Sequence, residues 1–167
     1  MKSKEITTMP KPEYVIEPGR QDLTSSTIMD APRELVFKAY TDPNLFAQWW
    51  GPRRYKNEID KYDARTGGEW RVVQRGEDGS AHAFRGVHHD VVAPERICAT
   101  FEYEGFPGHV ALQTATFEPV GNKTRIVAHV VFESIMDRDG MVASGMQEGA
   151  DESMERLAEL LEKSKGR

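Results

Sequence analysis

Cysteine is almost absent from this sequence. Its 167 residues include a single cysteine, Cys98, which excludes an intramolecular disulfide and any zinc site built from several cysteines. No stretch approaches the ~18 consecutive apolar residues that a membrane-spanning helix needs, so we expect no membrane span. The residues that follow Met1 also lack the apolar segment of a secretory signal, and we therefore expect a cytoplasmic location.

An excess of positive charge is lacking as well. The chain has 22 Lys and Arg against 27 Asp and Glu, which gives a net charge of −5 and a pI near 5.6. Because nucleic-acid-binding domains usually carry a basic surface, no nucleic-acid partner is expected. Gly67-Gly68 lies in neither a Walker sequence nor a dinucleotide-binding pattern, and no Gly-x-Ser-x-Gly elbow occurs. We therefore expect no cofactor.

The composition suits one folded domain with an extension at its start. Hydrophobic residues make up 38% of the chain, and a domain of this length buries roughly 70% of its unfolded surface. Three prolines interrupt residues 1–22, where only Tyr14–Ile16 has the character of a strand. We interpret residues 1–22 as an N-terminal extension and residues 23–164 as the domain.

The spacing of apolar residues changes along the domain. Leu23–Met29 has the composition of a strand, whereas Glu34–Tyr40 and Asn44–Trp49 carry apolar residues at helical spacing and predict two short helices. From Tyr55 to Glu133 the period becomes two, in runs separated by turn residues. This pattern predicts an antiparallel meander of about six strands in addition to the first one.

The C-terminal region from Arg138 to Lys163 is predicted to be one long helix. Its apolar residues recur every three or four positions and form one stripe, and about 24 helical residues would extend ~36 Å. Gly145 and Gly149 would leave space against a sheet, and Leu157 and Leu161 would fill it further along. We therefore predict an α+β helix-grip fold, in which a curved antiparallel sheet of about seven strands wraps around a long C-terminal helix.

Five short motifs resemble those of a known superfamily. They are Ala31–Pro43, Trp49–Pro52, Asp63–Trp70, Phe84–Val87 and Pro94–Ile97. The chain resembles the SRPBCC superfamily, whose START-like, Bet v-like domains have the helix-grip fold. Within it, the resemblance is to a bacterial branch related to the C-terminal domain of the activator of the ninety-kilodalton heat-shock protein ATPase. The resemblance extends from about Leu23 to Lys163 and implies the same fold, but one fold hosts many activities.

A cavity between the sheet and the C-terminal helix is the predicted ligand site. Strand parity directs Trp70, Val72, Phe84 and Phe101 toward this gap, and flexible methionines are suited to line an apolar cavity. Relatives often carry Gly-Trp where this chain has Gly145-Met146, so the shape of a relative's pocket does not transfer. The predicted ligand-binding residues are Trp49, Trp70, Val72, Gln74, Phe84, His88, Phe101, Tyr103, Met141, Gly145, Met146 and Gly149, among which His88, Tyr103 and Gln74 would orient the ligand.

The five histidines do not indicate a metal site. His82 and His88 share strand parity, but a separation of six residues along a strand spans ~20 Å. The adjacent His88 and His89 face opposite sides of the sheet. Because a metal needs three or four convergent ligands and none are evident in the sequence, we predict no metal. His88 is interpreted either as a polar contact on the concave face or as an ordinary hydrogen-bonded strand histidine.

Three other motifs have a structural interpretation that competes with a functional one. Trp49 and Trp50 could both stack on a ligand, but we favour one in the core and the other at the edge of a pocket. Asp63 and Arg65 are interpreted as a surface ion pair rather than a catalytic pair. Asp137–Gly140 is interpreted as the turn that starts the C-terminal helix rather than as a calcium loop.

The leading functional hypothesis is the binding of a small apolar molecule. A co-chaperone-like interaction module, which could contact a chaperone, is an alternative that the resemblance implies. An enzyme of the cyclase or hydratase type is another, because such enzymes occur in the superfamily. That activity needs a positioned acid–base pair, and only His88 is a candidate, so no catalytic residue is assigned. A monomer and a dimer both remain open.

Overall fold

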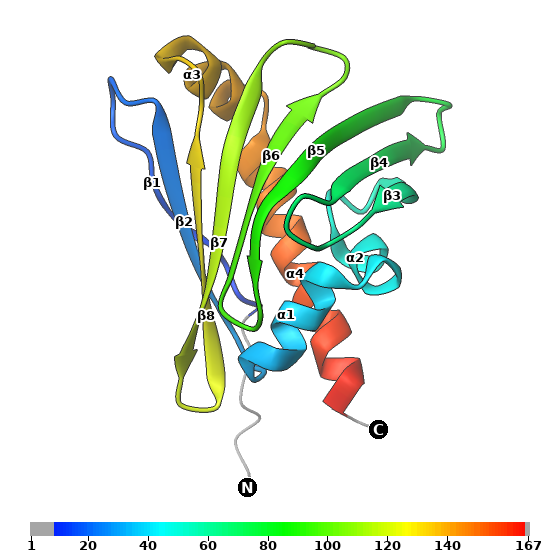
Figure 1. The fold of residues 1–167 in the computed structure, drawn as a ribbon, viewed down its shortest axis with the longest axis vertical. Coiled ribbons are helices and arrows are strands. Elements are labelled where there is room, and N and C mark those ends of the chain that lie inside the picture. Colours follow the sequence, from blue (N-terminus) through cyan, green and yellow to red (C-terminus); the bar gives the residue numbers. More distant parts are fainter. Residues whose placement is uncertain (1–8, 166–167) are drawn as a thin grey trace, which may run out of the picture.

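One antiparallel sheet of eight strands forms the frame of the molecule (Figure 1). The computed structural model describes residues 9–165. The strand order across the sheet is β1-β2-β8-β7-β6-β5-β4-β3, with β1 and β3 as the two open edges. In chain order the strands are β1 (Glu13–Val15), β2 (Asp22–Met29), β3 (Tyr55–Tyr62), β4 (Glu69–Gly76), β5 (Ala81–Val92), β6 (Arg96–Tyr103), β7 (Val110–Val120) and β8 (Lys123–Val131).

Four helices accompany the sheet. They are α1 (Arg33–Thr41), α2 (Pro43–Trp49), α3 (Ile135–Ala143) and α4 (Met146–Lys165). Figure 1 shows α4 crossing one face of the sheet, with α1 and α2 beside its C-terminal half and α3 near its N-terminus. The predicted α+β helix-grip class is confirmed, including the two short helices that follow Met29. The short β1 adds an eighth strand to the seven that the pattern predicted.

The prediction of one helix from Arg138 to Lys163 is wrong, because the region contains α3 and the longer α4. Gly145, between them, has a φ of +89°, a conformation that is easy for glycine and commonly ends a helix. The N–H of the preceding Ser144 still bonds to the last turn of α3. The apolar spacing continues from Val142 to Met146 across this break, so periodicity did not reveal it.

Local side chains explain where two of the helices begin. The Asp42 carboxylate accepts from the backbone N–H of Asn44 at 2.9 Å, and the proline that follows Asp42 occupies the first turn of α2. The hydroxyl of Ser134 accepts from the N–H of Asp137 at 3.0 Å and caps α3. Asp137–Gly140 therefore lies inside α3 and is not the turn before a helix, which corrects the sequence interpretation.

The concave face of the sheet carries two separate hydrophobic clusters. The main cluster joins α1, α2 and α4 to the sheet, and its buried residues are Met29, Ala31, Val36, Phe37, Ala39, Phe46, Trp49, Trp70, Val72, Ile97, Phe117, Ile126, Leu157 and Leu161. The minor cluster consists of buried Leu23, Ala111 and Phe132, with Ile16, Val130, Met141, Val142 and Met146 packed against them. No helix in residues 9–165 is long and apolar enough to cross a membrane.

Candidate functional site

Three aromatic rings on β5 and β6 form a continuous row on the concave face. This aromatic row consists of Phe84, Phe101 and Tyr103. The ring centroid of Phe84 lies 5.4 Å from that of Phe101 and 5.2 Å from that of Tyr103, with interplanar angles of 28° and 29°. Phe84 pairs across the sheet with the buried Val72, which shows that the row faces the core side. All three rings remain partly exposed to solvent.

Trp70 and Trp50 support the aromatic row from two sides. The indole of Trp70 is buried and stacks on Phe101 with a centroid distance of 6.1 Å. Its Nε1–H donates to the main-chain oxygen of Thr100 at 3.1 Å, so the polar atom is satisfied inside the core. Trp50 meets Phe84 edge-on at 5.3 Å. These contacts fix the orientation of the rings in the row.

A patch of small and polar side chains separates the aromatic row from the strands at the other edge. This small-residue patch consists of Ser25, Ala99, Gln113, Ala115 and Ala128. The register places Ser25 opposite Ala128 and Ala128 opposite Ala115, while Ala99 lies opposite Gln113. All five side chains are at least partly exposed. Because small side chains project little from a sheet, the patch leaves the two hydrophobic clusters apart.

Gln113 is the informative member of the patch. It lies on the central strand β7, and its neighbours two positions away, Ala111 and Ala115, have the same parity as the buried Phe117. Gln113 therefore faces the concave side, yet it is exposed. Solvent thus reaches the concave face between the main and minor clusters. The sequence analysis missed this patch, although alternate small residues along β7 were a visible signal.

His88 lies at the border of the small-residue patch, opposite Ala99. Its side chain is buried, with Nδ1 located 3.3 Å from the main-chain oxygen of Gly68, and its ring meets Tyr62 edge-on at 5.6 Å. Burial disfavours the charged imidazolium and lowers the pKa of His88 below its ordinary value. His88 is therefore a neutral, hydrogen-bonded group on the concave face near pH 7.

Two of the predicted ligand-binding residues are occupied by other structural roles. Trp49 is buried in the main cluster, and its Nε1–H donates to the main-chain oxygen of Ala39 at 2.9 Å. Gln74 is also buried, and its amide fills the space beside Gly51, where an added Cβ would lie 2.1 Å from Gln Nε2. Trp49 therefore anchors α2, while Gln74 supports the loop after α2.

The four predicted residues of the C-terminal region lie in different environments. Met141 and Met146 are partly buried and pack against the minor cluster. Gly145 lies in the exposed break between α3 and α4, so the helical position predicted for it is wrong. A Cβ on Gly149 would face Pro52 at 3.7 Å. A Cβ added at either glycine would therefore not meet the aromatic row. The two methionines lie at the end of the concave face that holds the minor cluster.

Two hollows lie away from the predicted ligand-binding residues. One has a volume of about 280 Å³ and is lined by Val15, Glu17, Arg20, Asp22, Leu23 and Thr24. The other has a volume of about 240 Å³ and is lined by Thr100, Val110, Ala111, Leu112, Val131, Phe132 and Glu133. Neither lining includes a member of the aromatic row.

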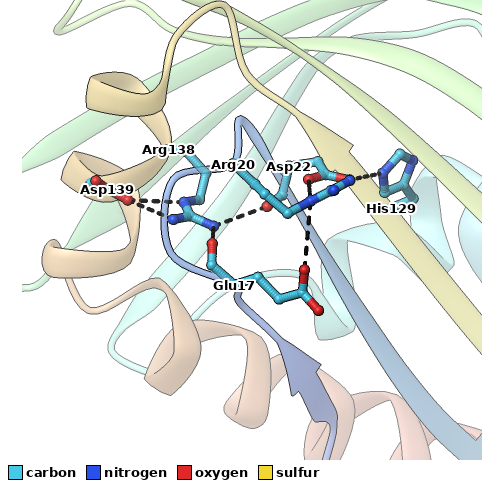
Figure 2. Close-up of polar contacts among 6 residues, drawn as sticks. All are labelled: Glu17, Arg20, Asp22, His129, Arg138 and Asp139. Carbon is cyan, nitrogen blue, oxygen red and sulfur yellow. Dashed lines mark hydrogen bonds and ion pairs between the residues drawn. The ribbon is translucent and has the colours of Figure 1, made fainter.

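Three residues that line the first hollow, Glu17, Arg20 and Asp22, belong to a network of charged side chains. Figure 2 shows this network. Arg20 and His129 both contact the carboxylate of Asp22, at 2.8 and 2.9 Å. The hydrogen bond from Arg20 holds the pKa of Asp22 well below its usual range. Nearby, the buried Arg138 donates to the main-chain oxygens of Glu17 and Asp22 at 2.8 and 3.1 Å. These contacts fix the loop between β1 and β2 against α3.

The other charged pair singled out in the sequence is structural. Arg65 Nε donates to Asp63 Oδ1 at 2.7 Å, and both side chains are exposed. This confirms the predicted surface ion pair.

His82 on β5 contacts the hydroxyl of Tyr103 through Nδ1 at 2.7 Å. The polar atom of the aromatic row therefore has a hydrogen-bond partner within the sheet.

The curved open sheet and the long helix that crosses its concave face define a helix-grip protein of the START-like class. The family model for "Activator of Hsp90 ATPase homolog 1-like protein" matches residues 30–162. The chain therefore belongs to this family, which confirms the resemblance seen in its motifs. A sequence search of curated proteins finds no match.

Solved structures show the same fold over most of the chain. A solution structure of an Arthrobacter aurescens protein is 23% identical, with a TM-score of 0.84, and the match covers 90% of this chain and 91% of that one. A crystal structure from Rhodobacter sphaeroides is 25% identical, with a TM-score of 0.82 and coverage of 90% and 99%. The AHSA1 protein from Silicibacter pomeroyi is 22% identical, with a TM-score of 0.73 and coverage of 86% and 99%.

Proposed function

We propose that this protein binds a small apolar molecule on the concave face of the sheet, beside the small-residue patch. The observation that supports the proposal best is the exposure of Gln113 on a central strand, on the side that α4 crosses. A fully packed interior would bury this position. An apolar ligand between the two hydrophobic clusters would replace solvent at this position.

The surrounding residues are suited to bind an apolar ligand. The aromatic row supplies flat apolar surface, and Met146 supplies an adaptable wall on the opposite side. Burial of about 200 Å² of apolar ligand surface would contribute about 5 kcal/mol before the costs of association. Gln113, Tyr103 and His88 would orient a polar end of the molecule. This set keeps Phe84, Phe101, Tyr103, His88 and Met146 from the residues predicted from sequence, and it leaves out Trp49, Gln74 and the two glycines.

The experiment is a binding measurement on a variant that fills the patch. Ala128→Leu adds three carbon atoms on the concave face, and Val127→Leu enlarges a side chain on the outer face of the same strand by one carbon atom. Binding of the fluorescent probe 1-anilinonaphthalene-8-sulfonate, whose aromatic rings bind apolar surfaces, should weaken by about tenfold or more in Ala128→Leu and stay unchanged in Val127→Leu. Equal affinities in the two variants would overturn the proposal.

Two assays on the same purified protein distinguish binding from catalysis. Lipophilic and polyketide-like compounds are incubated with the protein, binding is followed by native mass spectrometry, and conversion is followed by mass spectrometry of the compounds. We expect binding without turnover, because the imidazole Nδ1 of His88 is already engaged with a main-chain oxygen. Turnover that disappears in His88→Gln would favour the enzyme alternative instead.

A second candidate function is suggested by exposed apolar side chains near α3. Met136, Ile135 and Phe106 are 82%, 43% and 57% exposed, and exposed groups of apolar residues often mark interaction sites. Together with the family name, this favours contact with a chaperone of the Hsp90 type. The test is co-sedimentation with purified Hsp90. Met136→Ser should weaken a complex through this surface while leaving binding of the apolar probe unchanged.

A further inference from the structure

Three metal-ligating side chains from different parts of the chain converge at one end of the sheet. His109 precedes β7, Glu133 follows β8, and Asp137 lies in the first turn of α3. One ligand atom from each lies within 4.8 Å of the others. The sequence did not reveal this group, because His109 and Glu133 lie 24 positions apart in the chain and the pairing of β7 with β8 brings them together.

The geometry of His109 and Asp137 is held by their surroundings. His109 Nδ1 lies 3.0 and 2.9 Å from the two carboxylate oxygens of Asp137. The ring of Phe106 stacks on the His109 imidazole at a centroid distance of 3.9 Å and an angle of 11°. The backbone N–H of Asp137 is bound to the Ser134 hydroxyl. The imidazole and one carboxylate are therefore oriented toward the same point.

The charge at this point is unbalanced. Within residues 9–165, neither Glu133 nor Asp137 forms an ion pair with a lysine or arginine, and His109 is the side chain that contacts the Asp137 carboxylate. Two carboxylates held this close repel each other. A bound cation would remove that repulsion, and the His109 imidazole would serve as a further ligand.

We propose that His109, Glu133 and Asp137 bind a divalent cation of the zinc class. One imidazole nitrogen and two carboxylate oxygens match the donors that Zn²⁺ accepts, whereas Mg²⁺ and Ca²⁺ prefer oxygen alone. Ligand atoms around a tetrahedral Zn²⁺ lie about 3.4 Å apart, so side-chain rotations at this partly exposed site suffice to reach that spacing. Water completes the coordination.

The cation would link three segments of the chain at a point where side chains make the contacts between them. It would tie the β6–β7 loop and the end of β8 to the first turn of α3. Glu133 also lines the hollow of about 240 Å³ on the neighbouring surface, so the metal would lie at the border of that hollow. Binding to the folded chain alone stabilises it by mass action, and Zn²⁺ is expected to raise the Tm.

The experiment titrates ZnCl₂ into the full chain, purified without a histidine tag, by isothermal calorimetry. Wild type is compared with His109→Gln, Asp137→Asn and Glu133→Gln, and with the matched control His89→Gln, whose side chain is exposed on β5. Each of the three ligand variants should weaken Zn²⁺ binding by about tenfold or more. The control should bind like wild type.

Cobalt gives an independent readout of the same site. Co²⁺ bound through one imidazole and two carboxylates produces visible absorption bands, and these should disappear in Glu133→Gln, which replaces an exposed side chain and leaves the fold intact by circular dichroism. Absence of Zn²⁺ binding to wild type would overturn the proposal. Binding that all three ligand variants retain at wild-type affinity would overturn it as well, because the metal would then be held elsewhere.

Discussion

The hydroxyl of Tyr14 on β1 donates to the carboxylate of Asp151 on α4 at 2.9 Å. The same hydroxyl lies 3.2 Å from the main-chain oxygen of Gln147. Burial, together with the neighbouring carboxylate, raises the pKa of Tyr14 well above its usual range, so the phenol stays neutral and donates. This contact joins the first edge strand to the N-terminal half of the helix that crosses the sheet.

Tyr14→Phe should therefore destabilise the protein by about 1 kcal/mol, because it leaves the Asp151 carboxylate without this donor. Urea unfolding measures the change. Asp151→Asn is the matched control, since its amide oxygen still accepts from Tyr14, and it should lose less stability than Asp151→Ala. Equal stability of Tyr14→Phe and wild type would contradict this role.

Arg138→Met should destabilise the fold by about 3 kcal/mol. The guanidinium is 2% exposed, and its loss leaves the main-chain oxygens of Glu17 and Asp22 without their charged donor. Arg125→Met serves as the control, because Arg125 is exposed and its ion pair with Glu118 is 3.9 Å long. Urea unfolding should separate the two variants clearly. Similar losses would show that burial of Arg138 is not what matters.

Gly51→Ala should be more destabilising than Gly145→Ala. Both glycines have a positive φ, of +81° and +89°, so alanine is strained at either position. At Gly51 the new Cβ would also meet the Gln74 amide at 2.1 Å, whereas nothing lies within 4 Å at Gly145. We expect Gly51→Ala to lower the free energy of unfolding by about 1 kcal/mol or more beyond the loss in Gly145→Ala, as measured by thermal unfolding. The reverse order would contradict the described packing of Gln74.

The stability of the wild type should fall on acidification through the range just below pH 6.5. Burial lowers the pKa of His88 in the folded chain, whereas the unfolded chain titrates near the ordinary value of 6.5. In the window between these values the unfolded state binds more protons, so acid favours unfolding. Above pH 6.5 the contribution of His88 is fully present.

His88→Gln should remove this part of the pH dependence. Urea unfolding at several pH values between 5 and 7 measures the slope for the variant and for His89→Gln, whose side chain is exposed. The His89 variant should keep the wild-type slope. A wild-type slope in His88→Gln would show that other groups cause the acid sensitivity.

Local patterns were sufficient to predict most of the fold. The period-two runs and their turn residues predicted the strands, and the parity predicted for Trp70, Val72, Phe84 and Phe101 agrees with the register. The break at Gly145 was not predicted, because one residue in a positive-φ conformation changes the chain direction without disturbing the apolar spacing.

The candidate site was less accessible to sequence reasoning. Large apolar residues were selected as ligand contacts, but Trp49 is needed by the core, and the exposed concave position is Gln113. Which small residues become neighbours depends on the pairing of β2, β8, β7 and β6, whose order across the sheet differs from their order in the chain. The convergence of His109 with Asp137 depends on the same topology.

The most direct test of the central proposal is a nuclear Overhauser measurement between a bound apolar molecule and the methyl groups of the protein. The alanine methyls of residues 99, 115 and 128 are labelled with ¹³C, together with the methyls of Leu112 and Val131 on the outer face. The proposal predicts cross-peaks from the ligand to the three alanine methyls and none to Leu112 or Val131. Cross-peaks to the outer-face methyls alone would contradict it.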